Sequence, residues 1–521
     1  MKKLLLIKTM ALSAAIAAMF GLASCNEAGG EPTDTTPAVT SGAETTQTAA
    51  SSEQSVTEPS ATTAPEDVKM DYKAAKTIAA ATTEKSKKYA STNADESALI
   101  VKGKKTVNLT APVIDKTGGD SSSVQNSSLY GINAAFLAIG SPKALISGGS
   151  VTTKAKGAAG IFSYGSYGEV NGLSGDGTTV TVSDAKVTTS GDDSPAVMTS
   201  GAGKTNATNL TVTTEGNSSP AVGSDMSGNV ITVTGGTYTT KGTGSPAIFS
   251  KGNVTAKTAQ FVTENSEGIV IDGNNSVKLV GCNLTANNTK LSGNSRFLSA
   301  VRLFWSVPGD TNNNQTSFTM QYGTLTSKNG HVFHVTNTNA VINLSNVTLV
   351  NEDKAKNVIL LSVCPDGWSG NVNVAVFNAA KTALTGDILV AKKGKLTINL
   401  SSGTSWTGAI KGVITDANGE KVSDEQGIVY VNMSSDCTWT LTEDTYITHF
   451  SGNMDNVNLN GHKLYISGTT TTPTAAPTPQ TVIKKPTKKP TKKPTKKPTK
   501  KPTKKPAPKA TATTTQANAN P

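Results

Sequence analysis

A seven-residue motif recurs along the middle of the chain at an almost constant interval. It reads GDDSPAV, then GNSSPAV, then GTGSPAI. Its prolines are Pro195, Pro220 and Pro246, so the repeat is 25 and then 26 residues long. A unit this short cannot bury its own apolar side, but it can do so when it stacks on identical neighbours. The motif therefore predicts a solenoid.

The segments between the motifs alternate apolar and polar residues, as in Val230–Val233 and Leu396–Leu400, and end in Gly, Asn or Asp. This period of two is typical of β-strands. We therefore expect an all-β protein whose residues 67–468 form a right-handed parallel β-helix, with one turn per repeat. A stack of antiparallel β-sandwiches is the alternative, but no block of seven strands with hairpin signals supports it.

Two finer expectations concern the interior and the N-terminal end of the helix. The small residues Ala196, Ala221 and Ala247 follow the motif prolines and should stack on one another inside the coil. Tyr72–Tyr89 is the one stretch that has something of the 3.6-residue apolar period. It predicts a helical turn or more that caps the domain.

The N-terminus has the pattern of a bacterial lipoprotein. Residues 1–24 combine a lysine-bearing start with a short apolar run, and Leu22-Ala23-Ser24-Cys25 matches a lipobox. We expect the signal to be removed, Cys25 to carry the lipid, and the protein to be held at the extracellular face of the cell membrane. Residues 25–66 are rich in Thr, Ser and Pro and predict a flexible tether.

The C-terminal residues 469–521 form a disordered tail in which Lys-Lys-Pro-Thr repeats. Lys484–Lys509 contains 13 lysines and no acidic residue, so the tail accounts for the formal net charge of +11. Anionic envelope polymers are the expected partner, and a simple spacer is the alternative. Nucleic acid is disfavoured because the chain is exported and the tail has no aromatic residue to stack on bases. The candidate contact residues of the tail are Lys484, Lys485, Lys488, Lys489, Lys492 and Lys493.

Several segments resemble a family of exported, adhesin-like β-helix proteins of anaerobic gut bacteria. They are SSLYGINAA, which begins at Ser127, TKGTGSPAIFS, NSEGIVIDGNNSVKL and HVFHVTNTNAVINLSNVTL. The last coils, with CTWTLTEDTYIT and VNLNGHKLYISG, are also similar to autotransporter passengers. The resemblance implies a β-helix fold and an exported location. It implies no catalytic residue.

Many β-helices cleave polysaccharides, and such a site needs clustered acids with a nearby base. Asp192 and Asp193 are adjacent, but the next repeats lack them, which favours a solvated turn. Arg302, Trp305 and Asp310 form the most unusual cluster and are the candidate ligand contacts. The sequence lacks a complete lyase or glycosidase motif.

The remaining histidines, cysteines and tryptophans suggest no metal or cofactor site. His331 and His334 are three residues apart on one predicted strand, so they should point to opposite faces. Cys282, Cys364 and Cys437 could form one disulfide plus a thiol, or be three buried small residues. The four tryptophans could pack in the core or stack on a carbohydrate. They are Trp305, Trp368, Trp406 and Trp439.

These observations lead to a hypothesis of a membrane-anchored, adhesin-like binding rod without catalysis. Its repetitive Thr, Asn and Ser face would contact glycans or the surfaces of host or microbial cells. Two alternatives stay open at this point. One is a β-helix polysaccharide lyase or glycosidase, and the other is an envelope spacer retained by its basic tail.

Overall fold

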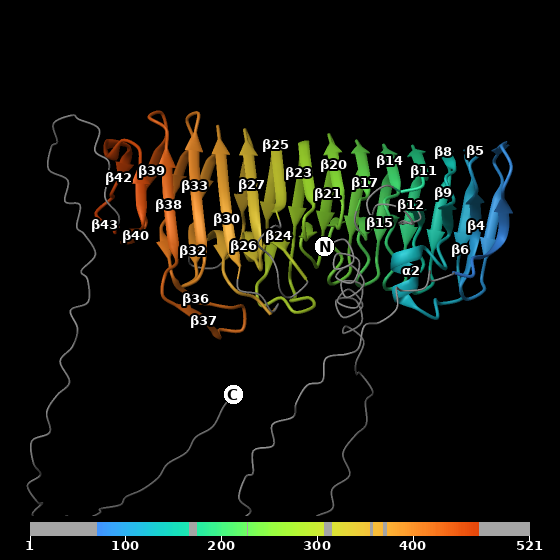
Figure 1. Ribbon diagram of the computed structural model, residues 1–521, viewed down its shortest axis with the longest axis horizontal. Helices are drawn as coiled ribbons and strands as arrows, with labels where there is room; N and C mark the ends of the chain where they lie inside the picture. Colours follow the sequence, from blue (N-terminus) through green and yellow to red (C-terminus); the bar gives the residue numbers. More distant parts are fainter. Residues whose placement is uncertain are drawn as a thin grey trace, which may run out of the picture. The chain divides into compact units, whose positions relative to one another are not determined.

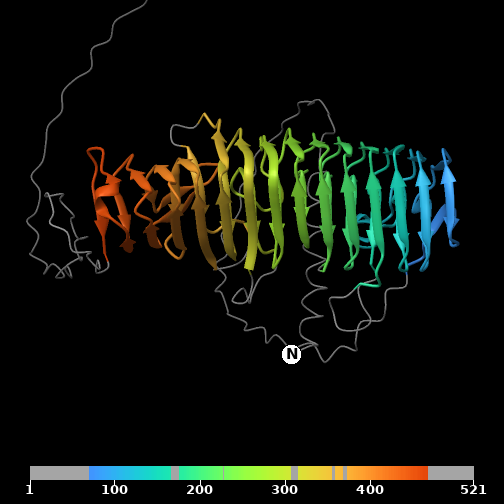
Figure 2. The same ribbon diagram turned by 90° about the horizontal axis from the view of Figure 1, so that it is seen from above.

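The computed structural model describes residues 70–165, 175–226, 228–306, 315–354, 358–367 and 372–467. The chain divides into two units, Met1–Lys484 and Lys485–Pro521, and every described residue lies in the first. These residues form a parallel β-helix whose coils follow one another in chain order along its axis (Figures 1 and 2). Strands of successive coils pair in parallel, which confirms the predicted fold and excludes antiparallel sandwiches.

Sheet A contributes one strand to most coils and has 13 strands. Its strands are β1 (Lys73–Ile78), β4 (Glu96–Lys102), β7 (Phe136–Ile139), β10 (Ile161–Tyr164), β13 (Val197–Ser200), β16 (Val222–Asp225), β19 (Ile248–Ser250), β22 (Ile269–Asp272), β24 (Ser299–Phe304), β26 (His331–Thr336), β29 (Ile359–Val363), β32 (Asp387–Val390) and β35 (Ile410–Lys411).

Sheet B has 22 strands and forms two strips, because most coils bend between two of its strands. The first strip comprises β2 (Thr82–Lys85), β5 (Thr106–Thr110), β8 (Lys143–Ser147), β11 (Thr179–Ser183), β14 (Lys204–Thr208), β17 (Val230–Thr234), β20 (Asn253–Lys257), β23 (Ser276–Ala286), β25 (Gln315–Ser327), β27 (Thr338–Ser345), β30 (Asn373–Ala380), β33 (Lys395–Ser401), β38 (Ile428–Met433) and β41 (His449–Ser451). The second comprises β3 (Lys88–Ser91), β6 (Val113–Lys116), β9 (Ser150–Thr153), β12 (Lys186–Thr189), β15 (Thr211–Thr214), β18 (Thr237–Thr240), β21 (Gln260–Thr263) and β28 (Thr348–Asn351). The long strands β23 and β25 run through both strips.

Sheet C pairs four short strands of the last coils. They are β31 (Ala383–Thr385), β34 (Ser405–Thr407), β39 (Thr438–Thr440) and β42 (Val457–Asn458). The other elements are the antiparallel pair β36 (Val413–Thr415) and β37 (Lys421–Asp424), the parallel pair β40 (Thr445–Ile447) and β43 (Leu464–Ile466), the helix α2 (Val124–Tyr130) and the 3-10 turn η1 (Met454–Asn456).

The core consists of equivalent side chains that stack from coil to coil. Val187 lies opposite Val212, which lies opposite Tyr238, and Tyr238 lies opposite Phe261. The rings of Tyr238 and Phe261 stack with their centroids 5.1 Å apart. The larger side chain of each repeat thus lies in the same stacked column. This stacking requires a nearly constant repeat length.

The Ser-Pro-Ala-Val motif forms the corner that leads into sheet A. Ala196 and Val197 both point into the core, although they are adjacent. A strand normally alternates its side chains, so the corner reverses the alternation at this point. The alanines at the first of these two positions, Ala196, Ala221 and Ala247, are all fully buried, as predicted. The carbonyl groups of Pro220 and Pro246 accept hydrogen bonds from the alanine amides of the preceding coils.

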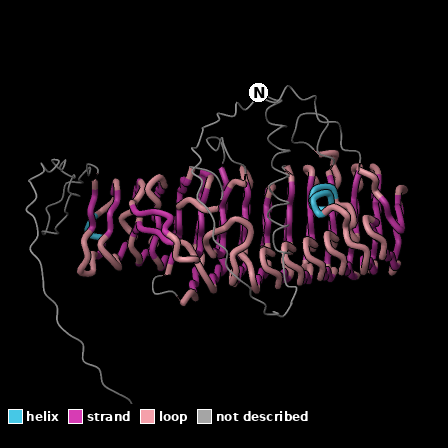
Figure 3. The backbone as a smooth tube through the Cα atoms, turned by 90° about the horizontal axis from the view of Figure 1, so that it is seen from below, coloured by secondary structure: helices cyan, strands magenta, loops and turns pink. Residues whose placement is uncertain are grey.

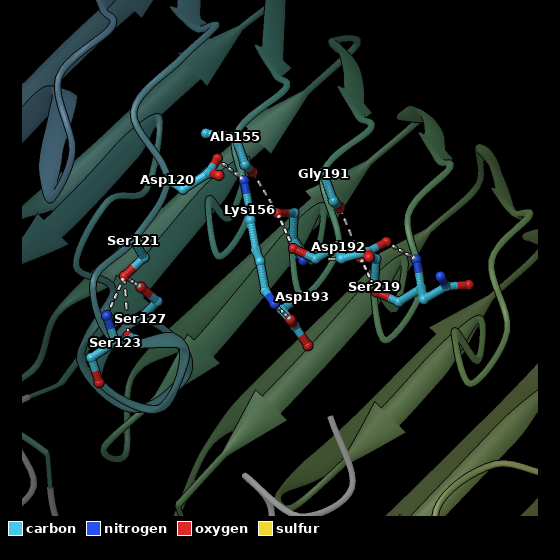
Figure 4. A network of polar contacts seen from close by, with 12 residues as sticks. Asp120, Ser121, Ser123, Ser127, Ala155, Lys156, Gly191, Asp192, Asp193 and Ser219 are labelled. Atoms are coloured by element: carbon cyan, nitrogen blue, oxygen red, sulfur yellow. Dashed lines mark hydrogen bonds and ion pairs between the residues drawn. The ribbon is translucent and has the colours of Figure 1, made fainter. Parts of the chain in front are cut away.

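The serine hydroxyl of the motif forms hydrogen bonds with backbone groups of the turn that precedes the corner. The hydroxyl of Ser219 accepts from the amide of Ser194 at 2.9 Å, and that of Ser245 accepts from the amide of Ser219 at 2.9 Å. Each hydroxyl also donates to a carbonyl of the preceding coil, as Ser219 does to Gly191 (Figure 4). Buried backbone groups at the turn therefore keep their partners without regular strand pairing.

Asp193 occupies a turn position that requires a left-handed backbone. Its φ is 54°, and the stacked positions Gly157, Ser218 and Gly244 have φ of 66°, 54° and 62°. Asp193 is 9% exposed and lies 3.7 Å from Lys156, whereas Asp192 accepts the amide of Asn217 in the next coil (Figure 4). The predicted solvated acid pair is therefore wrong for Asp193, whose burial raises its pKa to about 6.

The helical cap expected over Tyr72–Tyr89 is wrong. This stretch forms β1, β2 and the first half of β3, which make the first coil. Only Ile78 and Tyr89 of the segment are buried. The apparent helical period arose because a coil bends twice within this length, so its inward positions fall at irregular spacings.

At the other end, the described tryptophans of the last coils are core residues. Trp406 and Trp439 stack in the interior with their centroids 4.6 Å apart, and each donates its indole N–H to a glycine carbonyl. Cys282, Cys364 and Cys437 are buried free thiols, which confirms the second of the two alternatives.

Candidate functional site

The outward side of sheet A is buried from β4 to β32, whereas β1 is mostly exposed, and we call this buried side the covered face. At its N-terminal end, Leu137, Phe162 and Met198 form an apolar cluster. The helix α2 lies beside this cluster (Figure 3), with Ser123 as its N-cap and Gly131 as its C-cap. This part of the face is a second, smaller hydrophobic core.

The middle of the covered face carries charged side chains instead. Arg302 on β24 is 3% exposed, and its Nη2 lies 3.1 Å from the Glu267 carboxylate. Its guanidinium lies over the ring of Phe304, 5.1 Å from the centroid. The Nε and Nη1 atoms of Arg302 have no hydrogen-bond partner within the described chain. The predicted ligand contact Arg302 is therefore a buried, paired residue.

A relay of hydrogen bonds continues the charged region on β26 and β29. Nδ1 of His331 and Nδ1 of His334 each lie 2.7 Å from the Ser362 hydroxyl, and Nε2 of His334 lies 3.0 Å from Asp366. Two neutral histidines fit this pattern when His331 donates to Ser362, Ser362 donates to His334, and His334 donates to Asp366. The side chains of His334 and Asp366 are both fully buried.

The two histidines point to the same side of the sheet, which corrects the expectation of opposite faces. Val332 and Phe333 between them occupy the corner positions at which two successive side chains point inward. Both histidines therefore point outward, and both pack against Phe297. The reversal that the Ser-Pro-Ala-Val motif creates thus recurs in coils that lack the motif.

Asp366 is held by many donors. It accepts from the amides of Arg296 and Gly367 and from the hydroxyl of Ser295, besides His334. Although burial opposes the effect, the hydrogen bonds from the His334 side chain and the Arg296 amide hold the pKa of Asp366 below its ordinary value. The carboxylate therefore ties the segment around Arg296 to sheet A.

The same segment is tied to the antiparallel strands β36 and β37. Nε of Arg296 lies 2.7 Å from Asp416, and its Nη2 lies 3.3 Å from Glu420. Phe297, Cys364 and Ile414 form a further small apolar cluster at this place. The polar network and the cluster together fasten two insertions to one end of the covered face.

The covered face thus brings together acids, histidines and an arginine, as a glycoside-cleaving site would. Each of them has a protein partner, and all except the half-buried His331 are buried. Arg302 pairs with Glu267 and His334 pairs with Asp366, so these groups link different segments of the coils.

The other predicted site residues are only partly accounted for. Trp305 follows β24 and is half-buried, and its carbonyl accepts from Asn337. Asp310, Trp368, Cys25 and the lysines of the tail lie outside the described residues. Within the described ranges, no three His, Cys, Asp or Glu side chains gather in a group that could hold a metal ion.

The outward side of sheet B is open, and its most regular feature is a ladder of amides. The ladder runs through Thr319, Asn343, Asn378, Asn399 and Asn432 on five successive strands. Each asparagine donates its side-chain N–H to the residue before it, over 3.2, 2.8, 2.7 and 2.8 Å. We call this row the amide ladder.

A groove of about 250 Å³ runs beside the amide ladder. It is lined by Thr319, Met320, Gln321, Asn343, Leu344, Ser345, Asn378, Ala379, Ala380, Asn399 and Ser401. None of these residues is ionisable. The small side chains Ser345, Ala380 and Ser401 follow the ladder residues by two positions, so they form the low row next to it.

Each ladder asparagine keeps hydrogen-bonding capacity for a ligand. An amide nitrogen has two hydrogens and its oxygen has two lone pairs, and the ladder uses one of each at Asn343, Asn378 and Asn399. The groove therefore offers alternating donors and acceptors at the spacing of the coils, about 4.8 Å. Such a surface can bind a chain with many hydroxyl groups.

Sequence reasoning missed the amide ladder, although a signal was present. The segments Ile342–Ser345 and Ile398–Ser401 both read Ile-Asn-Leu-Ser, and Val431–Ser434 reads Val-Asn-Met-Ser. Aligning the coils on these segments would have placed their asparagines in one outward row. The Ser-Pro-Ala motif drew the alignment to the other half of the domain.

No family model, curated protein or solved structure matches the chain. The resemblance to adhesin-like proteins therefore stays a prediction. Among the described residues, no helix is both long and apolar enough to pass through a membrane.

Proposed function

We propose that the protein is an exported, lipid-anchored binding rod without catalytic activity, which holds a glycan in the groove beside the amide ladder. Cys25 would carry the lipid, residues 25–66 would lift the rod from the membrane, and the basic tail would contact anionic envelope polymers. The observation that carries the proposal is the groove itself, because it is open, carries the asparagine amides of the ladder and is free of ionisable side chains.

The lining favours neutral glycans over acidic ones. An acidic polysaccharide would need arginine or lysine to offset the cost of desolvating its carboxylates, and the groove has neither. Individual hydrogen bonds to hydroxyl groups are weak in water. Several coils acting together, and several copies on one cell, would supply the avidity that an adhesin needs.

The test is retention of the full-length protein on a panel of immobilised neutral and acidic polysaccharides, with new reducing or unsaturated ends scored in the same samples. We expect retention on at least one neutral glycan and no new ends. Asn378→Ala should lower the affinity about tenfold, by removing one rung of hydrogen bonds. Asn206→Ala is the matched control, since Asn206 is an outward asparagine of the same sheet, away from the groove.

Two outcomes would contradict the proposal. Retention that survives Asn378→Ala unchanged would place the ligand elsewhere on the protein. New chain ends that disappear in Arg302→Ala, while the folded state is retained, would show that the covered face is an enzyme site after all.

A further inference from the structure

Lys251 lies between two aspartates on the covered face, in three successive coils. Asp225 ends β16, Lys251 directly follows β19, and Asp272 ends β22. Nζ of Lys251 lies 3.2 Å from Oδ2 of Asp272 and 3.9 Å from Oδ1 of Asp225. The three side chains are each only 1–2% exposed. The amine and the two carboxyl groups therefore meet in the absence of bulk water.

The surroundings of this triad are apolar and fixed. Phe249, Val270 and Phe304 form a hydrophobic cluster on the same strands. The hydroxyl of Ser128 donates to Asp225 at 3.0 Å, and the amide and hydroxyl of Ser306 donate to the two oxygens of Asp272 at 2.9 and 2.7 Å. Both carboxyl groups are thus held in place by serine donors as well as by the lysine.

The three ionisable groups of the triad are incompletely paired. Nζ of Lys251 makes no hydrogen bond of good geometry within the described chain. Burial raises the pKa of the Asp225 carboxyl, against the lowering effect of Lys251. Buried ionised groups that lack good hydrogen bonds are costly. Neutral amine is the nucleophilic form of lysine.

We propose that Lys251 and Asp272 join in an intramolecular isopeptide bond, with Asp225 as the acid–base group. Lys251 gives a proton to Asp225, and its free electron pair attacks Cγ of Asp272. The new C–N bond forms, and the attacking nitrogen gives up a second proton through Asp225. The C–O bond of Asp272 breaks as these two protons reach the departing oxygen, which leaves as water. Ammonium and carboxylate become one neutral amide and one water, and Asp225 returns to its starting state. No oxidant, reductant or cofactor is needed.

The product would be a covalent tie between two adjacent coils. A β-helix is held together from coil to coil by non-covalent contacts, and a pulling force along its axis separates coils one after another. A bond between the coils of β19 and β22 would stop that separation near the middle of the described rod. This property suits a protein that holds a surface against flow, but it does not depend on the ligand.

The test is peptide mapping of the purified full-length protein by tandem mass spectrometry. We expect a branched peptide in which Lys251 and Asp272 are joined, lighter by one water than its two linear parts. Lys251→Arg keeps the charge and should abolish the branched peptide. Asp225→Asn keeps both reacting groups and should slow its formation about 100-fold, as expected for loss of a general acid–base.

The same digest contains an internal control. Lys411 and Asp387 also join neighbouring coils, with Nζ only 2.8 Å from the carboxylate, but the lysine side chain is 22% exposed. We expect these two residues only in linear peptides. If Lys251 of the wild-type protein also appears only in linear peptides, the proposal is wrong. A branched peptide that contains Asp225 in place of Asp272 would overturn the assigned roles of the two acids.

Discussion

The covered face and the open face are built from the same coils but use their outward positions in opposite ways. On the open face, identical asparagines stack and satisfy one another, so Asn343, Asn378 and Asn399 form a row that needs nothing else. On the covered face, unlike residues stack, so Arg302 and His334 are neighbours on β24 and β26 and must find partners elsewhere. Their partners, Glu267 and Asp366, come from corner and loop segments.

This difference shows how a solenoid separates binding from architecture. A repeated outward residue gives a regular surface that tolerates change, because each rung loses only its own contacts. A unique outward residue that is then buried makes its coil dependent on one partner. The covered face should therefore be far more sensitive to substitution than the open face, and three predictions test this.

Asp366→Ala should give the largest effect. The substitution leaves His334, Ser295 and two backbone amides without their acceptor in a buried place. Removing one partner of a buried pair typically costs about 3–5 kcal/mol of stability. Urea unfolding of wild type and variant measures the loss. Asp366→Asn, which still accepts hydrogen bonds, should lose less, and an equal loss in both variants would contradict the role given to the hydrogen bonds.

The second prediction concerns pH and His331. Its solvent-poor surroundings and the neighbouring His334 lower the pKa of His331 to about 3. In the unfolded chain a histidine takes up a proton near its ordinary pKa of about 6.5. The contribution of neutral His331 to folding stability is therefore fully present above about pH 6.5. It is lost as the pH is lowered towards 3, because the unfolded state binds the extra proton.

The measurement is the urea midpoint at pH 7 and at pH 5, in wild type and in His331→Gln. The wild type should lose more stability over this interval than the variant, which has no imidazole to protonate. The aspartates with lowered pKa values act below this interval. An identical pH dependence in both proteins would show that His331 is protonated as readily in the folded state as in the unfolded state.

The sequence predicted the elements that depend on repetition and failed where repetition ends. The stack of Ala196, Ala221 and Ala247 followed from the spacing of one motif. The faces of His331 and His334 did not follow, because the corner reversal depends on backbone geometry that strand alternation does not encode. The partners of Arg302 and His334 lie outside the strands and have no periodic signal.

The smallest effect should come from the amide ladder, in a double-mutant cycle on Asn378 and Asn399. Their side chains are 2.7 Å apart and half-buried on the open face. Each single alanine variant should lose about 1 kcal/mol, and the coupling between them should be about 0.5 kcal/mol, since water replaces the lost partner. Urea unfolding of the four proteins gives these values. A loss near that of Asp366→Ala would mean that the ladder is a structural element, and the reduced glycan retention expected for Asn378→Ala would then report unfolding and not a lost contact. A small loss keeps the two faces distinct and lets that binding measurement be read directly.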